Sequence, residues 1–184
     1  MEASPRLKTL LIAAALAAWP AVLRAEVADR IVSVVGETVV TESDLGFEEA
    51  FAEHDVSPLP PFERADADLL QRLEDYRILR TLAADVDVFR PPPGAVDARL
   101  EAFKESWSRR ADYEAFLERW GMDEARLREA IYARLVIERY VARNLGLTPD
   151  DLTRPDEVIE RYEAFMQRRR PLVPERRLDP LEAP

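Results

Sequence analysis

Residues 29–45 read DRIVSVVGETVVTESDL, and this stretch decides the fold. Two short runs of β-branched residues lie on either side of Gly36-Glu37, a pair that permits a tight turn between strands. Ser43 fits the N-cap of a following helix, with Asp44 in the first turn, where a negative charge is favourable. The stretch therefore predicts a short N-terminal β-hairpin that leads directly into a helix.

The rest of the chain has the apolar spacing of amphipathic helices, with proline-rich breaks at 56–62 and 87–94. The expected helices cover residues 44–53, 65–84, 95–108, 112–120, 124–144 and a last segment that begins at Thr153 or Asp156 and ends near 169. The 124–144 helix has the widest apolar stripe, Tyr132 included, and we expect it to be buried on more than one side and to cover the hairpin. The predicted fold class is mainly α with a short β-hairpin.

Composition excludes several classes of function. The chain has 184 residues, a length that allows one domain, and its formal net charge of −10 argues against a nucleic-acid binder. There is no cysteine and one histidine, His54, so neither a thiolate site nor a multi-histidine metal site is possible. We predict no catalytic residues, no metal site and no cofactor, and we expect the acidic residues Glu48, Glu49 and Glu53 to form a solvated face.

Residues 1–25 have the pattern of a secretory signal peptide. Arg6 and Lys8 precede an apolar stretch over residues 9–22, which is shorter than the roughly 20 residues that span a bilayer. A small residue, Ala25, offers a cleavage site. The pattern predicts export to a bacterial periplasm, cleavage after about Ala25 and no stable membrane insertion.

The chain from residue 27 to 146 resembles the N-terminal domain of SurA-type periplasmic chaperones and parvulin foldases. In that family a strand, a turn, a second strand and a Ser-Asp precede the first helix, and a glycine-containing turn precedes a later long helix. The matching residues here are Asp29-Arg30-Ile31-Val32, Val34-Val35, Val39-Val40-Thr41, Ser43-Asp44-Leu45, Gly121-Met122-Asp123-Glu124 and Leu127-Arg128-Glu129-Ala130-Ile131. We accordingly expect a chaperone domain over 26–146, an additional helix over 147–170 and a disordered tail over 171–184.

The resemblance implies an ATP-independent chaperone, or holdase, that binds unfolded or nascent outer-membrane and periplasmic proteins. Family members normally continue into a parvulin module with paired histidines, and this chain has His54 alone. Peptidyl-prolyl isomerase activity is therefore not expected. A non-catalytic assembly factor for one periplasmic partner is the alternative, and an isomerase with an unorthodox site stays open.

A group of large side chains between residues 103 and 122 is the candidate client-binding surface. An aromatic groove gives sequence-tolerant apolar contact, as a holdase needs, whereas the competing interpretation is packing of two helices against the core. The candidate residues are Phe103, Trp107, Tyr113, Phe116, Trp120 and Met122. The arginines at 168–170 and 176–177 are expected in a flexible, solvated segment, with contact to anionic lipid or an acidic partner as the alternative.

Overall fold

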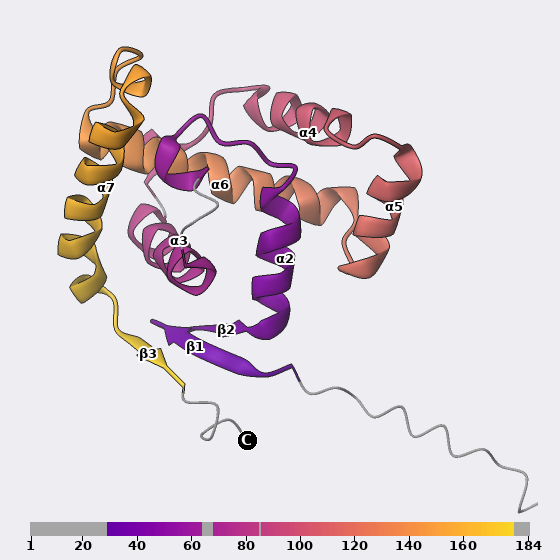
Figure 1. Ribbon diagram of the computed structural model, residues 1–184, viewed down its shortest axis with the longest axis horizontal. Coiled ribbons are helices and arrows are strands. Elements are labelled where there is room, and N and C mark those ends of the chain that lie inside the picture. The colour runs from indigo at the N-terminus through magenta and orange to yellow at the C-terminus, as the bar shows by residue number, and fades with distance from the viewer. Residues whose placement is uncertain (1–28, 64–67, 85, 179–184) are drawn as a thin grey trace, which may run out of the picture.

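The hairpin and the succession of helices are present in the computed structural model, which describes residues 29–63, 68–84 and 86–178 (Figure 1). The fold class is confirmed: the protein is mainly helical with a small antiparallel sheet. The predicted signal peptide at 1–25 lies outside the described residues. The helices and strands are β1 (Ile31–Val35), β2 (Thr38–Thr41), α2 (Glu42–Ala52), α3 (Leu69–Ala83), α4 (Ala95–Glu105), α5 (Arg110–Arg119), α6 (Glu124–Leu145), α7 (Pro155–Arg169) and β3 (Glu175–Arg177).

The first helix begins earlier than its sequence suggested. Thr41, not Ser43, is the N-cap of α2: its side chain accepts a hydrogen bond from the Asp44 N–H, and the Asp44 carboxylate accepts one from the Thr41 N–H. This reciprocal capping box satisfies two backbone donors at once. The Ser43 N–H instead donates to Asp29, 3.1 Å away. The strand β2 therefore passes into α2 without a loop.

The prediction of a disordered tail from residue 171 is wrong for residues 171–178. A short 3-10 turn, Arg170–Leu172, leads to β3, which pairs antiparallel with β1 and gives the strand order β2-β1-β3. The Gly36 N–H donates to the Pro174 carbonyl at 2.7 Å, and Val173 is buried in the core. Backbone pairing to the free edge of β1 thus orders a segment whose own apolar content is low.

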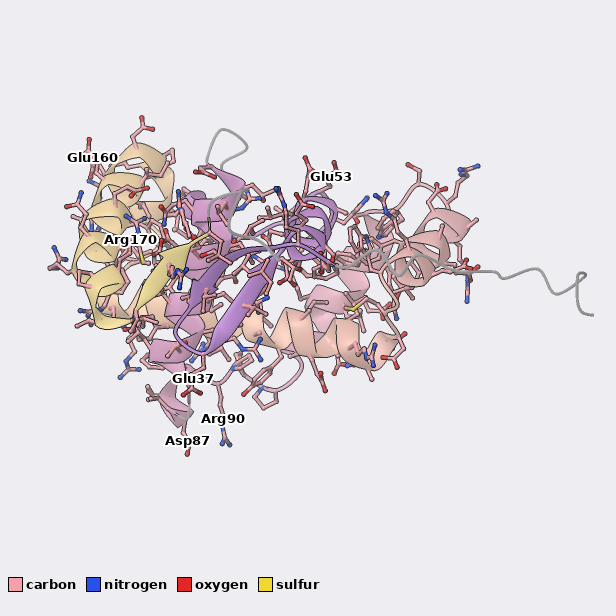
Figure 2. The ribbon with its side chains drawn as sticks, turned by 90° about the horizontal axis from the view of Figure 1, so that it is seen from below. Glu37, Glu53, Asp87, Arg90, Glu160 and Arg170 are labelled. Atoms are coloured by element: carbon pink, nitrogen blue, oxygen red, sulfur yellow. The ribbon has the colours of Figure 1, made fainter. Side chains whose placement is uncertain are left out.

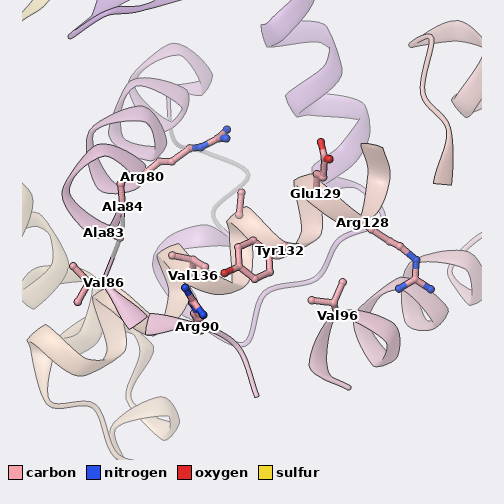
Figure 3. A pocket seen from close by; sticks show the side chains of 11 residues that line it. Arg80, Ala83, Ala84, Val86, Arg90, Val96, Arg128, Glu129, Tyr132 and Val136 are labelled. Carbon is pink, nitrogen blue, oxygen red and sulfur yellow. The ribbon is translucent and has the colours of Figure 1, made fainter. Parts of the chain in front are cut away.

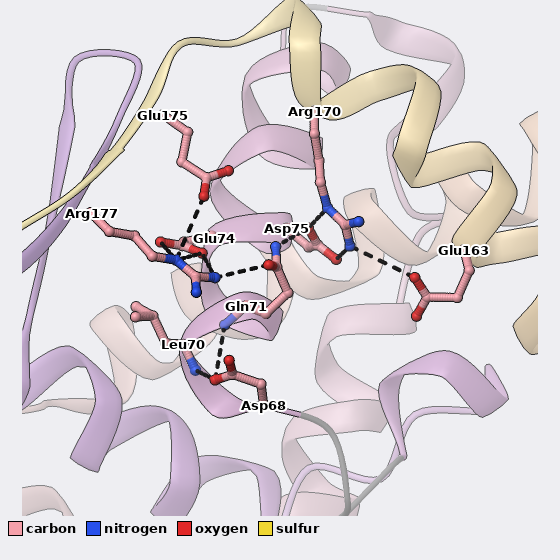
Figure 4. A network of polar contacts seen from close by, with 9 residues as sticks. All are labelled: Asp68, Leu70, Gln71, Glu74, Asp75, Glu163, Arg170, Glu175 and Arg177. Carbon is pink, nitrogen blue, oxygen red and sulfur yellow. Dashed lines mark hydrogen bonds and ion pairs between the residues drawn. The ribbon is translucent and has the colours of Figure 1, made fainter.

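Ion pairs to α3 hold the same segment in place (Figure 4). Arg177 donates to the fully buried carboxylate of Glu74, with the closest contact at 2.6 Å. Arg170 donates two parallel hydrogen bonds of 2.8 Å to the buried carboxylate of Asp75. Each buried acid on α3 therefore has a cationic partner supplied by the C-terminal segment.

The helix α3 lies between the sheet and α6 (Figure 1). The expectation that the hairpin would pack on the 124–144 helix is wrong, because the apolar face of the sheet rests on α3, which in turn packs against α6. The α7 helix closes one end beside the 3-10 turn Pro60–Phe62. The main core contains Val35, Val40, Leu59, Phe62, Leu73, Tyr76, Ile78, Leu79, Ala83, Ile137, Tyr140, Val141, Tyr162, Phe165, Met166 and Val173.

Candidate functional site

The six candidate residues come together, but as part of a second, smaller core. This aromatic core is built by α2, α4, α5 and the first half of α6, and its buried members are Phe51, Leu100, Phe103, Phe116, Leu127 and Ile131. Phe103 and Phe116 are 1% and 5% exposed, so they are packing residues and cannot touch a client in this conformation. Trp107, Tyr113, Trp120 and Met122 are half-buried around them. Client contact stays a prediction for those four.

The single histidine belongs to this aromatic core. The imidazole of His54 stacks on the indole of Trp107, with 3.5 Å between ring centroids and an interplanar angle of 19°. Its Nδ1 lies 2.9 Å from the Ser106 hydroxyl. Partial burial lowers the pKa of His54, and the nearby carboxylate of Glu53 only partly opposes that shift. The ring therefore acts as a neutral packing group at neutral pH.

A glycine inside α2 admits the indole of Trp120. A Cβ built on Gly46 would lie 2.9 Å from Cη2 of that ring, a distance that real Cβ atoms essentially never show. The neighbouring Phe47 meets the same indole edge-on, with centroids 5.8 Å apart. The end of α5 is therefore docked on α2 at a position where only glycine leaves room.

The expected solvated face on α2 is wrong for Glu48, which is buried. Its carboxylate pairs with Arg134 of α6, whose guanidinium lies over the ring of Tyr76 at 4.0 Å from the centroid. Burial raises the pKa of Tyr76 to about 12. These groups neutralise each other in the interface of α2, α3 and α6, so they act as a structural cluster and form no acid–base pair open to a substrate.

An open groove lies on another face of the molecule, between the end of α3, the 3-10 turn Asp87–Phe89, the start of α4 and the middle of α6 (Figure 3). Its volume is about 590 Å³, and its lining residues are Arg80, Ala83, Ala84, Val86, Arg90, Val96, Arg128, Glu129, Tyr132, Ala133 and Val136. Such a volume accommodates a few side chains of an extended segment.

Two large apolar side chains of this groove face solvent. Tyr132 is 42% exposed and Val86 is 43% exposed. Including Tyr132 in the buried stripe of the 124–144 helix was therefore wrong at this position. The stripe is wider than the surfaces that cover it, and the side of α6 toward the groove is left open. The breadth of the stripe was the signal in the sequence, but breadth alone does not show which edge stays uncovered.

Three arginines and one glutamate line the groove. Arg90 pairs with Asp87 at 2.8 Å, an exposed pair within one turn of chain (Figure 2), and Arg128 pairs with Asp97 of α4. Among the described residues, Arg80 has no ion-pair partner. On a chain of net charge −10, this is a local concentration of cationic side chains beside apolar ones.

In the described parts of the chain, neither the pattern of a metal site nor that of a membrane-spanning helix is present. Within residues 29–63, 68–84 and 86–178, no group of three or more histidine, aspartate or glutamate side chains is placed to hold a metal ion. No helix in those ranges is long and apolar enough to cross a membrane.

No protein-family model matches the chain, and no curated protein matches it. The resemblance to SurA-type chaperones therefore stays a prediction.

Proposed function

We propose that the protein is an ATP-independent periplasmic holdase and that the groove beside α6 is where it binds unfolded client segments. The observation that carries this proposal is the exposure of Tyr132 and Val86 in an open groove of about 590 Å³. Grouped exposed apolar side chains on a highly charged protein mark an interaction surface. The predicted signal peptide supports a periplasmic location.

The shape of the groove suits a holdase better than an enzyme. It is bounded by four separate elements and lies open to solvent, so an extended chain can enter and leave without a lid. Burial of a client's apolar surface supplies about 25 cal/mol per Å², which is enough for reversible binding when only a few side chains are covered. Neither nucleotide nor proton transfer is needed. Clients are expected to be unfolded outer-membrane or periplasmic proteins.

The test is suppression of aggregation of a denatured outer-membrane porin by the mature protein without ATP. The variant Val86→Ser/Tyr132→Ser removes the two exposed apolar groups and leaves the buried core intact. Val56→Ser is the matched control, because Val56 is 67% exposed but does not line the groove. We expect suppression by the wild type and by the control, and a loss of several fold in the double variant.

Two results would contradict the proposal. Well-folded wild-type protein that leaves porin aggregation unchanged would exclude a general holdase and favour the assembly factor with one partner. Equal suppression by the wild type and the groove variant would move the client site elsewhere. Circular dichroism of each variant separates lost binding from lost folding.

A further inference from the structure

We propose that the groove selects apolar client segments that carry aspartate or glutamate beside their apolar residues. This inference rests on the proposed function and adds the chemical class of the client. It comes from charge complementarity: the lining combines exposed apolar side chains with three arginines and one opposing carboxylate.

The cationic groups differ in how firmly they are already paired. Arg128 is held by Asp97 and by Glu124, with 3.6 Å between Arg128 Nε and the nearer Glu124 oxygen, so it is a neutralised part of the wall. Among the residues that the structure describes, Arg90 has one ion-pair partner, Asp87, and the two side chains are 70% and 82% exposed. Exposed pairs of this kind contribute little, so Arg90 can exchange its partner for a client carboxylate at little cost.

The decisive group is Arg80. It is exposed on α3, it lines the groove, and it has no ion-pair partner among the described residues. Figure 3 shows Arg80 and Arg90 on the side of α3 and its following turn, with Tyr132 and Glu129 on α6. The two guanidinium groups lie on opposite sides of Tyr132 in Figure 3, so a client that places its apolar residue on Tyr132 brings its flanking residues toward one arginine or the other.

The rest of the surface strengthens this selection. The chain has 36 acidic and 26 basic residues, so an acidic client segment is repelled by the protein as a whole and finds few cationic sites. Beside the groove, Arg80 has no ion-pair partner among the described residues and Arg90 has an exposed one, so both can accept a client carboxylate. Basic clients, in contrast, are drawn to the general surface and gain no ion pair with these two arginines. The preference should weaken as salt is raised, because exposed charges are screened.

The experiment measures binding of three fluorescein-labelled peptides to the mature protein by fluorescence anisotropy. Each peptide is acetylated and amidated at its ends and has the same central Val-Ile-Phe-Val, flanked by Glu, Gln or Lys. Capped ends remove the terminal charges, and the anionic fluorescein label is common to all three peptides, so any difference between them comes from the Glu, Gln or Lys side chains. We expect the Glu peptide to bind about fivefold more tightly than the Gln peptide, and the Lys peptide to bind most weakly.

Two arginine variants locate the effect. Arg80→Gln and Arg90→Gln are exposed and should fold, and each should reduce the preference for the Glu peptide while leaving the Gln peptide unchanged. Arg139→Gln is the matched control, because Arg139 is exposed on α6 and does not line the groove. It should retain the full preference.

The outcomes separate this inference from the proposed function. Equal binding of all three peptides, lost in Val86→Ser/Tyr132→Ser, overturns the charge selection and leaves the holdase in place. A Glu preference that survives both arginine variants also overturns it, because the carboxylate then binds elsewhere. If no peptide binds and porin aggregation is unaffected, both proposals are refuted.

Discussion

Replacing Gly46 by alanine should destabilise the protein, although Gly46 lies inside a helix. In an unconstrained helix interior the change would stabilise by about 1 kcal/mol, because glycine loses more backbone freedom on folding than alanine. Here the new methyl group would lie 2.9 Å from the ring edge of Trp120. Overpacking of this kind costs about 1–3 kcal/mol, so we expect a net loss of about 1 kcal/mol.

The reasoning is tested by a double-mutant cycle with Trp120→Leu. Leucine lacks the ring atoms that approach α2, so Gly46→Ala should stabilise the Trp120→Leu background by about 1 kcal/mol. The two changes should thus be coupled by about 2 kcal/mol, within the range found for residues in contact. Urea unfolding followed by circular dichroism at 222 nm measures all four proteins.

A control variant checks the helix-propensity contribution alone. Ala115 is exposed in the middle of α5, and Ala115→Gly should cost about 1 kcal/mol. If Gly46→Ala stabilises the wild type by that same amount, or if the cycle shows no coupling, then Trp120 does not require a glycine at position 46.

Three further predictions follow from buried or partly buried charges. Glu48→Gln should cost about 3 kcal/mol in urea unfolding because it leaves the Arg134 guanidinium buried without its counter-charge, and adding Arg134→Met should recover most of that loss. His54 has a lowered pKa in the folded protein, so the unfolded chain binds the proton first, and the free energy of unfolding should fall as the pH drops below about 6.5. His54→Gln should lose less stability than the wild type between pH 7 and 5. Identical dependence of stability on pH in the two proteins would refute this prediction. Burial and the like charge of Glu74 raise the pKa of Glu175, so the ionised form of Glu175 opposes folding. Glu175→Gln should therefore raise the free energy of unfolding at pH 7 by less than about 0.5 kcal/mol. This gain should disappear below the ordinary pKa of 4.5, where the carboxyl is protonated in both the folded and the unfolded protein.

Local patterns predicted most of the fold. The hairpin depends on a turn glycine between two runs of valine, and each helix depends on spacing within a few residues. The predicted start of α2 was wrong because Thr41 and Ser43 are both good N-cap residues. Asp44 distinguishes them, since it forms a capping box with Thr41.

The features that sequence reasoning missed depend on distant partners. Glu48 is buried in an ion pair with Arg134, which lies 86 residues further along the chain. Nothing in the sequence near Glu48 indicates that pairing. Arg177 donates to Glu74, which lies 103 residues earlier in the chain. Because local sequence does not show this partner, the polar C-terminal segment was predicted to be disordered. At the candidate site, spacing brought the aromatic residues into one cluster. It did not show that the phenylalanines lie inside and that the open surface lies along α6 instead.

The pairing of β3 with β1 has a consequence for how the molecule is made. The strand β1 has its second neighbour in residues 175–177, which follow all the described helices in the chain. A two-stranded hairpin alone is marginally stable in water, and the acids that face this region from α3 lack their arginines until the C-terminal segment arrives. Synthesis therefore has to pass residue 177 before β1 can gain this neighbour. A ribosome that stops early releases a chain with an unpaired sheet edge and two buried carboxylates without counter-charges, which is a substrate for proteolysis.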